Sequence, residues 1–241
     1  MTSASKKFIG EFLGTFILCY IGCGGCVLTS QTPQMGPILF VFLIIGLASG
    51  FGPISGAHFN PAVSLIMLLT GKMTIVEFVY YLCAQFTGAF SGFYLLYLLL
   101  LSITNGKVTN LACNGYGNLS QYKISASIAC FVECFITCFF TFVILVVSNN
   151  PAVGAKAPFI VGSTLGTIAF FSEGLTGGSM NPARSLAPAL IMGGEPLRQV
   201  WVFMIFPMVG AFIAAYLYMF LLGEEKHDEK KENYIEMKNK E

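Results

Sequence analysis

The sequence predicts an all-helical membrane protein built from two similar halves, and three observations carry this prediction. First, 55% of its 241 residues are hydrophobic and only 10% are charged, whereas roughly a quarter of the residues of a soluble domain are charged. Second, uncharged runs cover residues 12–71, 78–106 and 199–223, and each exceeds the ~20 residues that a spanning helix needs. Third, the tripeptide Asn-Pro-Ala occurs at residues 60–62 and again at 181–183.

An internal repeat relates the two halves. Glu11 precedes Asn60 by 49 residues, and Glu133 precedes Asn181 by 48. The sequence around the two glutamates is also similar, Glu-Phe-Leu-Gly-Thr-Phe in the first half and Glu-Cys-Phe-Ile-Thr-Cys-Phe in the second. Self-similarity at a fixed interval indicates two copies of one structural unit.

Six spanning helices are predicted from the apolar runs. In chain order they cover about residues 8–28, 37–54, 75–101, 124–147, a fifth that begins with 158–171, and 200–222. The first span carries five glycines, which favour close helix packing in lipid. The channel domain is therefore placed at 8–222, with repeat halves at about 8–101 and 122–222, between a cytoplasmic N-terminus (1–7) and a charged, solvated cytoplasmic tail (223–241).

Each of these two Asn-Pro-Ala tripeptides opens a short helix. Asn is a favoured N-cap, and Pro is favoured at the next position, where it has no N–H to lose. The first such helix, from Pro61 to about Gly71, is roughly 16 Å long, about half the thickness of a bilayer. It must therefore be re-entrant, and so must the second, which ends at about Met192. The amide N–H groups of both asparagines are expected to face a ligand, because no neighbouring residue is an obvious acceptor.

The distribution of lysine and arginine predicts the orientation. With the N-terminus in the cytoplasm, nine of these residues lie inside and three outside. The C-terminus then also lies inside, and the two half-helices enter from opposite faces, so the repeats are inverted. The loop at about 102–121 lies outside, and its Asn118-Leu-Ser sequence is a glycosylation candidate.

Inverted repeats with broken helices build a polar site near the middle of the bilayer, because non-helical backbone survives there only where protein or water satisfies it. Two half-helix N-termini that meet there concentrate partial positive charge, which repels cations and protons. The carbonyl groups of residues 55–58 and 177–180 offer acceptors to neutral molecules. The sequence thus predicts a passage for uncharged solutes.

Together these features resemble the aquaporin, or major intrinsic protein, family. The resemblance covers residues 8–222 and rests on the paired tripeptides, the sequence Ser-Gly-Ala-His-Phe before the first, Arg184 directly after the second, and the acids in the first and fourth spans. It implies six spans plus two half-helices, one pore per subunit and a homotetramer in the lipid bilayer. The expected location is the plasma membrane or an intracellular vesicle or vacuole membrane. No cofactor, metal or nucleic acid is expected as a partner.

The resemblance also implies roles for individual residues. Asn60 and Asn181 would be the central donors of the pore. The complete set of implied residues comprises the two tripeptides, a selectivity constriction and three residues that brace the loops: Asn60, Pro61, Ala62, Asn181, Pro182 and Ala183; Phe40, Ala169, Gly178 and Arg184; Glu11, Glu133 and His58.

The constriction departs from the water-selective type of the family. Such pores usually carry a histidine where this chain has Ala169, and the small residues Ala169 and Gly178 predict a wider, less polar gap. Other positions favour water, because Ser185 and Ala189 stand where glycerol facilitators typically have an acid and a base. Phe203 fits the water type, although Met204 departs from its usual Trp. We therefore expect a channel for water that also passes glycerol, urea or ammonia.

The same residues bear on other possible functions. An aquaglyceroporin with glycerol as its main solute is the first alternative, and a secondary transporter with inverted repeats is a weaker one, since coupling needs ionisable groups at the site. A junction role is disfavoured by the intact pore residues. No catalytic set, zinc or disulfide pattern among the eight cysteines, or phosphate-binding loop is present, so an enzyme is not expected. A third Asn-Pro-Ala, at 150–152, falls outside the repeat and is treated as a chance match.

Overall fold

The computed structural model describes residues 2–32 and 35–222, and the predicted charged tail lies outside these ranges. The described part contains six helices long and apolar enough to cross a membrane. The first, Ser3–Leu28, consists of α1 (Ser3–Ile17), a π-helical turn (Leu18–Cys23) and α2 (Gly24–Leu28). The other five are α3 (Met35–Ser55), α5 (Ile75–Ile103), α6 (Ala126–Ser148), α7 (Ala157–Thr176) and α9 (Gly194–Leu222).

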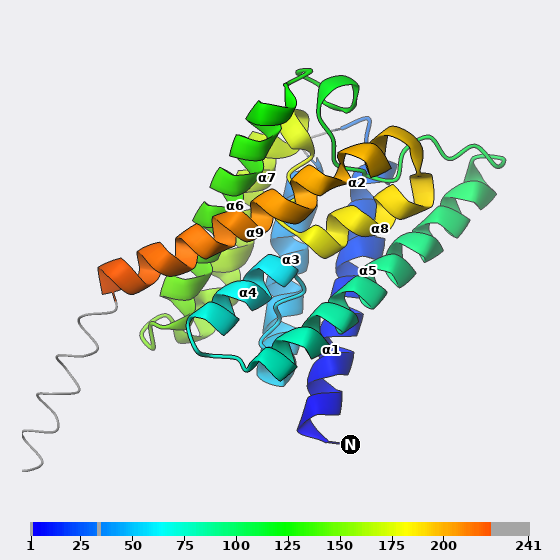
Figure 1. Ribbon diagram of the computed structural model, residues 1–241. Helices are drawn as coiled ribbons and strands as arrows, with labels where there is room; N and C mark the ends of the chain where they lie inside the picture. Colours follow the sequence, from blue (N-terminus) through cyan, green and yellow to red (C-terminus); the bar gives the residue numbers. More distant parts are fainter. Residues whose placement is uncertain (1, 33–34, 223–241) are drawn as a thin grey trace, which may run out of the picture.

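Two short helices complete the bundle, α4 (Pro61–Leu69) and α8 (Pro182–Met192). Figure 1 shows α4 in the half of the bundle that holds the N-terminus and α8 in the half beneath the 104–125 loop. Neither is long enough to cross a bilayer, as the sequence predicted. The remaining connections hold only two 3₁₀ turns, Gly117–Leu119 and Gly154–Lys156, among the residues that the structure describes.

Two spans begin well before their predicted starts, and the structure sets the end of the fifth, which the sequence analysis left open. The first span begins at Ser3, five residues before the predicted start. The fifth continues to Thr176, where Gly177 ends it in a left-handed conformation (φ 77°) that glycine adopts without strain. The sixth begins at Gly194, six residues before the predicted start, although Pro196 follows at once. Proline is tolerated there because the first turn of a helix has no partners for its N–H groups.

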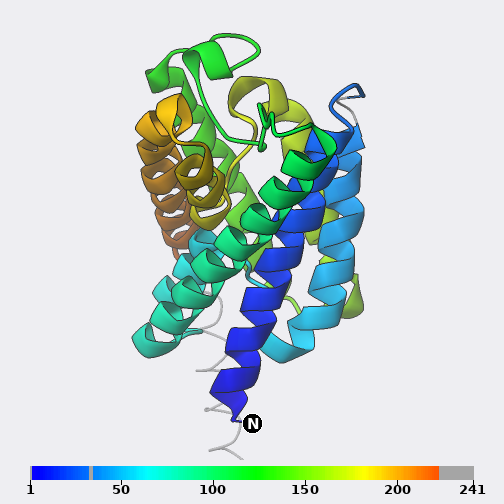
Figure 2. The same ribbon diagram turned by 90° about the vertical axis from the view of Figure 1, so that its right-hand side faces the viewer.

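The two halves of the chain use the same helix contacts. α1 packs along α5 in the first half, and α6 packs along α9 in the second, as Figures 1 and 2 both show. A glycine lies at each crossing. A Cβ atom on Gly88 would overlap the carbonyl oxygen of Phe12, and one on Gly210 would overlap that of Cys134. The helix backbones therefore touch, which is the close packing that small residues allow in membranes.

The outer surface of the bundle is apolar. Large hydrophobic side chains there are widely exposed, as expected for groups that face lipid; the most exposed are Phe42, Phe131 and Phe220. Polar residues are instead buried inside, where they surround the ends of α4 and α8. A polar interior within an apolar shell is the arrangement that places the candidate site.

Gly210→Ala should destabilise the protein, because the new methyl group overlaps the backbone of α6. Overpacking of this kind costs about 1–3 kcal/mol. The matched control is Gly46→Ala on α3, since a Cβ atom there meets nothing within 4 Å. Thermal unfolding in detergent, followed by circular dichroism, should show a lower midpoint for Gly210→Ala only. Equal midpoints for the two variants would contradict the backbone contact.

Candidate functional site

The two asparagines cap their half-helices. The Asn60 side-chain oxygen accepts the backbone N–H of Ala62 at 2.8 Å. The Asn181 oxygen accepts those of Ala183 at 3.1 Å and Arg184 at 3.2 Å. Both asparagines have extended backbone angles, and proline follows each as the first helical residue. The local sequence thus fixes where each half-helix begins and which way its first amide groups point.

The amide nitrogens of the same asparagines link the two halves. Asn60 Nδ2 donates to the carbonyl of Met180, and Asn181 Nδ2 donates to the carbonyl of Phe59, both at 2.8 Å. One N–H of each amide thus has an acceptor within the protein and does not face a ligand, although no neighbouring residue in the sequence supplies that acceptor. Their acceptors lie more than 100 residues away in sequence, where no local pattern reveals them. Each amide has a second N–H, and both asparagines line the central cavity.

The loops before the half-helices hold strained backbone at matching positions. In the first half Ala57 (φ 55°) and Phe59 (φ 50°) are left-handed, and in the second half Gly178 (φ 53°) and Met180 (φ 52°) are. These pairs lie three residues and one residue before their asparagines. A non-glycine residue in this region costs about 1–2 kcal/mol, so other contacts must hold the loops in place.

Glu11 holds the first loop. It is completely buried, and its carboxylate accepts four hydrogen bonds from the loop and from α5. The donors are Ser55 Oγ at 2.7 Å, His58 N at 3.0 Å, Phe59 N at 2.7 Å and Gln85 Nε2 at 2.8 Å. A carboxylate inside the bundle thus satisfies backbone N–H groups that no helix or water would satisfy.

Glu133 holds the second loop in the same way. It too is completely buried. Its donors are Thr176 Oγ1 at 2.6 Å, Ser179 N at 3.0 Å and Met180 N at 3.0 Å. The three donors stand at the repeat positions of Ser55, His58 and Phe59. The repeat seen in the sequence is therefore a repeat of one hydrogen-bonding scheme.

The halves differ beyond the glutamates. In the first, Gln85 Nε2 also donates to Ser64 Oγ at 2.9 Å, and that hydroxyl lies 3.1 Å from Nδ1 of His58. The His58 ring also lies against Tyr81, with ring centroids 5.0 Å apart. Sequence reasoning missed Gln85, although an uncharged polar residue in the middle of an apolar span is a visible signal. Its Oε1 is buried and accepts no hydrogen bond from the residues that the structure describes.

In the second half, Asn114 from the 104–125 loop is at the centre of the corresponding hydrogen-bond network. Its side-chain oxygen accepts hydrogen bonds from Arg184 and, at 2.8 Å, from Ser185, and its Nδ2 donates to the Thr176 carbonyl at 3.0 Å. Arg184 also donates to the Ala112 carbonyl at 2.8 Å. The sequence predicts only that this loop lies outside the membrane, and nothing in its composition distinguishes Asn114. Only 4% of its surface is exposed, and this burial results from the tertiary structure.

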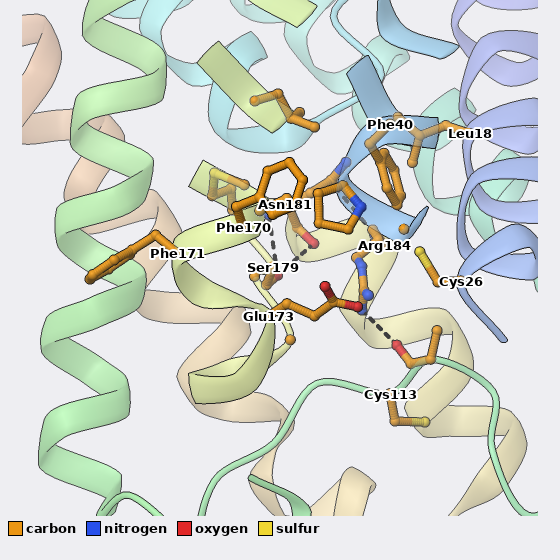
Figure 3. Close-up of a pocket in the computed structure, with 18 of the residues that line it drawn as sticks. Leu18, Cys26, Phe40, Cys113, Phe170, Phe171, Glu173, Ser179, Asn181 and Arg184 are labelled. Carbon is orange, nitrogen blue, oxygen red and sulfur yellow. Dashed lines mark hydrogen bonds between the residues drawn. The ribbon is translucent and has the colours of Figure 1, made fainter. Parts of the chain in front are cut away.

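These elements surround one cavity of about 640 Å³. Phe40, Asn181 and Arg184 lie around it in Figure 3. The lining contains the two asparagines, His58 and all four residues of the predicted constriction: Asn60, Asn181, His58, Phe40, Ala169, Gly178 and Arg184. The prolines and alanines of the two tripeptides are buried behind it, as are both glutamates. Asn118 lies in the exposed 3₁₀ turn of the 104–125 loop.

The carbonyl groups of the loops are only partly free for a solute. That of Ser55 accepts the Tyr81 hydroxyl at 2.6 Å, and that of Met180 accepts Asn60, so the predicted acceptor ladder loses one member in each half. The carbonyls of residues 56–58 and 177–179 accept no hydrogen bond within the described part of the chain. Residues 58 and 177–179 line the cavity and offer acceptors beside the asparagine donors.

The site contains no evident place for a metal. Within residues 2–32 and 35–222, no three side chains of His, Cys, Asp or Glu gather closely enough to hold an ion. All eight cysteines, which lie in these ranges, are free thiols. Cys113 lines the cavity from the loop, and burial raises its pKa to about 11, so it remains a neutral thiol at physiological pH. What remains is a hydrogen-bonding passage with one cationic side chain.

Comparison with known proteins agrees with this architecture. The family model described as Major intrinsic protein matches residues 1–218. The proteins named Aquaporin Z from Rhodopseudomonas palustris and Brucella melitensis are each 35% identical to this chain; each alignment covers 91% of the chain and, respectively, 95% and 99% of the relative. The crystal structure of the aquaglyceroporin from Plasmodium falciparum superposes with a TM-score of 0.77 at 28% identity, covering 89% of this chain and 95% of that one.

Glu133→Gln should unfold the second loop. The amide keeps one acceptor oxygen but turns an NH₂ group toward backbone N–H donors, and a hydrogen bond to a charged group is worth about 1.5–3 kcal/mol. We expect a clear fall in the thermal midpoint in detergent. Glu77→Gln is the control, because Glu77 forms a half-exposed ion pair with Lys7 that contributes at most about 1 kcal/mol. A stable Glu133→Gln protein would contradict the bracing role.

Asn114→Ala should remove one of the two hydrogen bonds that hold the Arg184 guanidinium against the 104–125 loop. The guanidinium keeps the Ala112 carbonyl but loses its side-chain acceptor, so it moves into the vacated space and the gap beside Phe40 widens. The ratio of glycerol to water permeability in proteoliposomes should therefore rise. Asn118→Ala, an exposed change in the same loop, should leave that ratio as it is. An unchanged ratio in folded Asn114→Ala protein would show that Asn114 does not position Arg184.

Proposed function

The chain belongs to the major intrinsic protein family, and from that premise we propose that it is a passive channel for water and small neutral solutes. It excludes ions and protons, and glycerol, urea and ammonia are the additional solutes. The observation that carries the proposal is the meeting of α4 and α8 at the asparagine pair. Each helix end contributes about half a positive charge, and the asparagines add donors without adding a net charge.

Roles follow for the residues around the cavity. Asn60 and Asn181 each offer the remaining amide N–H to a passing oxygen atom. Phe40, Ala169, Gly178 and Arg184 form the constriction, where Arg184 repels cations. A charge this deep in a membrane is expensive and is retained for a function. Its hydrogen bonds to the 104–125 loop hold it beside the passage and leave its charge uncompensated by direct contact.

The size of the gap supports passage of solutes larger than water. Ala169 carries only a methyl group, and Gly178 has a backbone that disfavours any side chain. A Cβ atom at Gly178 would lie 2.6 Å from Ser172 Oγ, in addition to its left-handed φ of 53°. The fold itself therefore keeps that wall open. This supports glycerol as a solute of the channel. The likeness to an aquaglyceroporin supports the alternative in which glycerol is the main solute.

Coupled transport finds no support in the site. The only acids well inside the spans, Glu11 and Glu133, are saturated with hydrogen bonds from the loops and do not line the cavity. Glu173 does line the cavity, but it lies in the last turn of α7, at the mouth of the passage. Ion-coupled transporters bind substrate and ion near the middle of the bilayer, and no acid lines the cavity there among the described residues. We also propose no enzymatic activity.

The protein is a multi-pass integral membrane protein. We place its termini in the cytoplasm from the lysine and arginine distribution, which puts the 104–125 loop and Asn118 outside. Four copies would assemble through the apolar outer surface, each with its own passage. The plasma membrane or an intracellular vesicle or vacuole membrane would hold this tetramer.

Stopped-flow light scattering of proteoliposomes tests the function directly. Vesicles that hold the full chain should shrink faster than empty vesicles in an osmotic gradient, with no dependence on sodium or proton gradients. They should also re-swell faster when glycerol or urea forms the gradient. Shrinkage at the rate of empty vesicles would end the proposal, and slow water flux with fast glycerol flux would favour the alternative of an aquaglyceroporin.

A size series at Ala169 tests the constriction. In the order Gly, Ala, Val, His, the side chain fills more of the gap, so glycerol permeability should fall steeply while water permeability falls less. The histidine variant should lose most glycerol flux, because a polar ring both narrows the gap and removes its apolar wall. The two permeabilities are measured on the same vesicles. A parallel fall of both would place the limiting gap elsewhere.

A further inference from the structure

A second charged residue lines the cavity next to the constriction. Glu173 lies in the last turn of α7, four residues after Ala169 and so one helical turn further out on the same face. Both residues line the cavity. A carboxylate therefore lies directly beyond Ala169 of the predicted constriction, at the end of the cavity that the 104–125 loop covers.

Glu173 faces Arg184 without touching it. Figure 3 shows the two side chains pointing toward one another inside the cavity. Their charges attract, but no ion pair joins them, and Glu173 accepts no hydrogen bond from any residue that the structure describes. The facing wall gives it room, because Gly36 has no side chain there and a Cβ atom on it would lie 3.3 Å from Glu173 Oε1.

Glu173 is exposed at the mouth of the cavity, and its surroundings contrast with those of the two buried acids of the described bundle, Glu11 and Glu133. Glu11 and Glu133 are saturated with donors from the protein, whereas the carboxylate of Glu173 is left with its acceptor sites open toward the cavity. Arg184 is held from behind by Ala112 and Asn114, so it cannot swing fully across to Glu173. The gap between them is thus maintained by the fold.

We infer that Glu173 and Arg184 form a solute-binding site for small neutral molecules that carry a hydrogen-bond acceptor on one side and N–H donors on the other, with urea as the simplest example. The inference rests on the proposed channel function and deepens it. The carbonyl oxygen of the solute accepts from the guanidinium, and its amide groups donate to the carboxylate. The solute then enters the constriction already desolvated on both sides.

The paired charges select for neutral molecules. A cation near the carboxylate also meets Arg184, and an anion near Arg184 also meets Glu173, so neither gains the full attraction. A neutral molecule with opposite polarity at its two ends is favoured by both groups. Such a site stays weak, which a channel requires, because a solute must leave as readily as it enters.

The test compares wild-type protein with Glu173→Leu and Glu173→Gln in proteoliposomes. Water permeability is measured with and without the same urea concentration on both sides, and urea permeability is measured separately. In the wild type, urea should slow water flux in a saturating manner, because it occupies the mouth. Glu173→Leu should abolish this slowing and lower urea flux roughly tenfold more than water flux, since a site built for a hydrogen bond loses most when its acceptor is removed. Glu173→Gln keeps an acceptor oxygen, so its urea flux and its slowing by urea should lie between those of the wild type and Glu173→Leu.

Two controls isolate the site. Glu195→Gln removes a charge on the same side of the membrane, at the start of α9 and away from the cavity lining, and should behave as the wild type. Dimethyl sulfoxide, close to urea in size but without N–H groups, should not slow water flux in a way that depends on Glu173. Equal changes of water and urea flux in Glu173→Leu, or urea slowing that survives in it, would overturn the inference while the channel stands. Wild-type vesicles no faster than empty ones would overturn the proposed function itself.

Discussion

The structure depends on one constraint, that backbone without helical partners must be satisfied by protein when it lies inside a membrane. The two re-entrant loops break the helical pattern in the middle of the bundle and hold left-handed residues there. Glu11 and Glu133 meet the constraint by accepting the backbone N–H groups that face away from the cavity. The carbonyls of the same loops are thereby left to face inward. One pair of buried acids thus creates both the stability of the loops and the polarity of the passage.

The asparagine pair adds the link between the halves. Because each amide donates to a carbonyl of the opposite loop, the two half-helix ends are fixed relative to each other and not only to their own loops. The close contacts at Gly88 and Gly210 bring the surrounding helices near enough for this. The centre of the passage is therefore set by hydrogen bonds that cross the repeat, on a frame of helix contacts made within each half.

The two halves of the chain differ in the residues that surround their re-entrant loops, at the two ends of the cavity. The first half closes its loop with His58, Ser64 and Gln85, all uncharged polar groups in mutual contact. The second half instead presents Arg184, which is held by the loop on one side and faces a carboxylate across the cavity. Charge, a small-residue wall and hydrogen-bonding groups thus meet at the Arg184 end, whereas the centre presents the uncharged amides of the asparagine pair.

The sequence by itself determined the spans, the half-helices and the repeat, because each rests on local physics: apolar length for a span, Asn followed by Pro for a helix start, and an interval between like residues for the repeat. Through its family resemblance it also predicted Asn60 and Asn181 as the central donors of a passage and Arg184 as part of its constriction. Only the tertiary structure decided that the asparagines bond across the repeat, that Asn114 holds Arg184, and that Glu173 faces it unpaired. These contacts join residues far apart in the chain, and partner choice at such distance depends on how the helices pack, which no local pattern records.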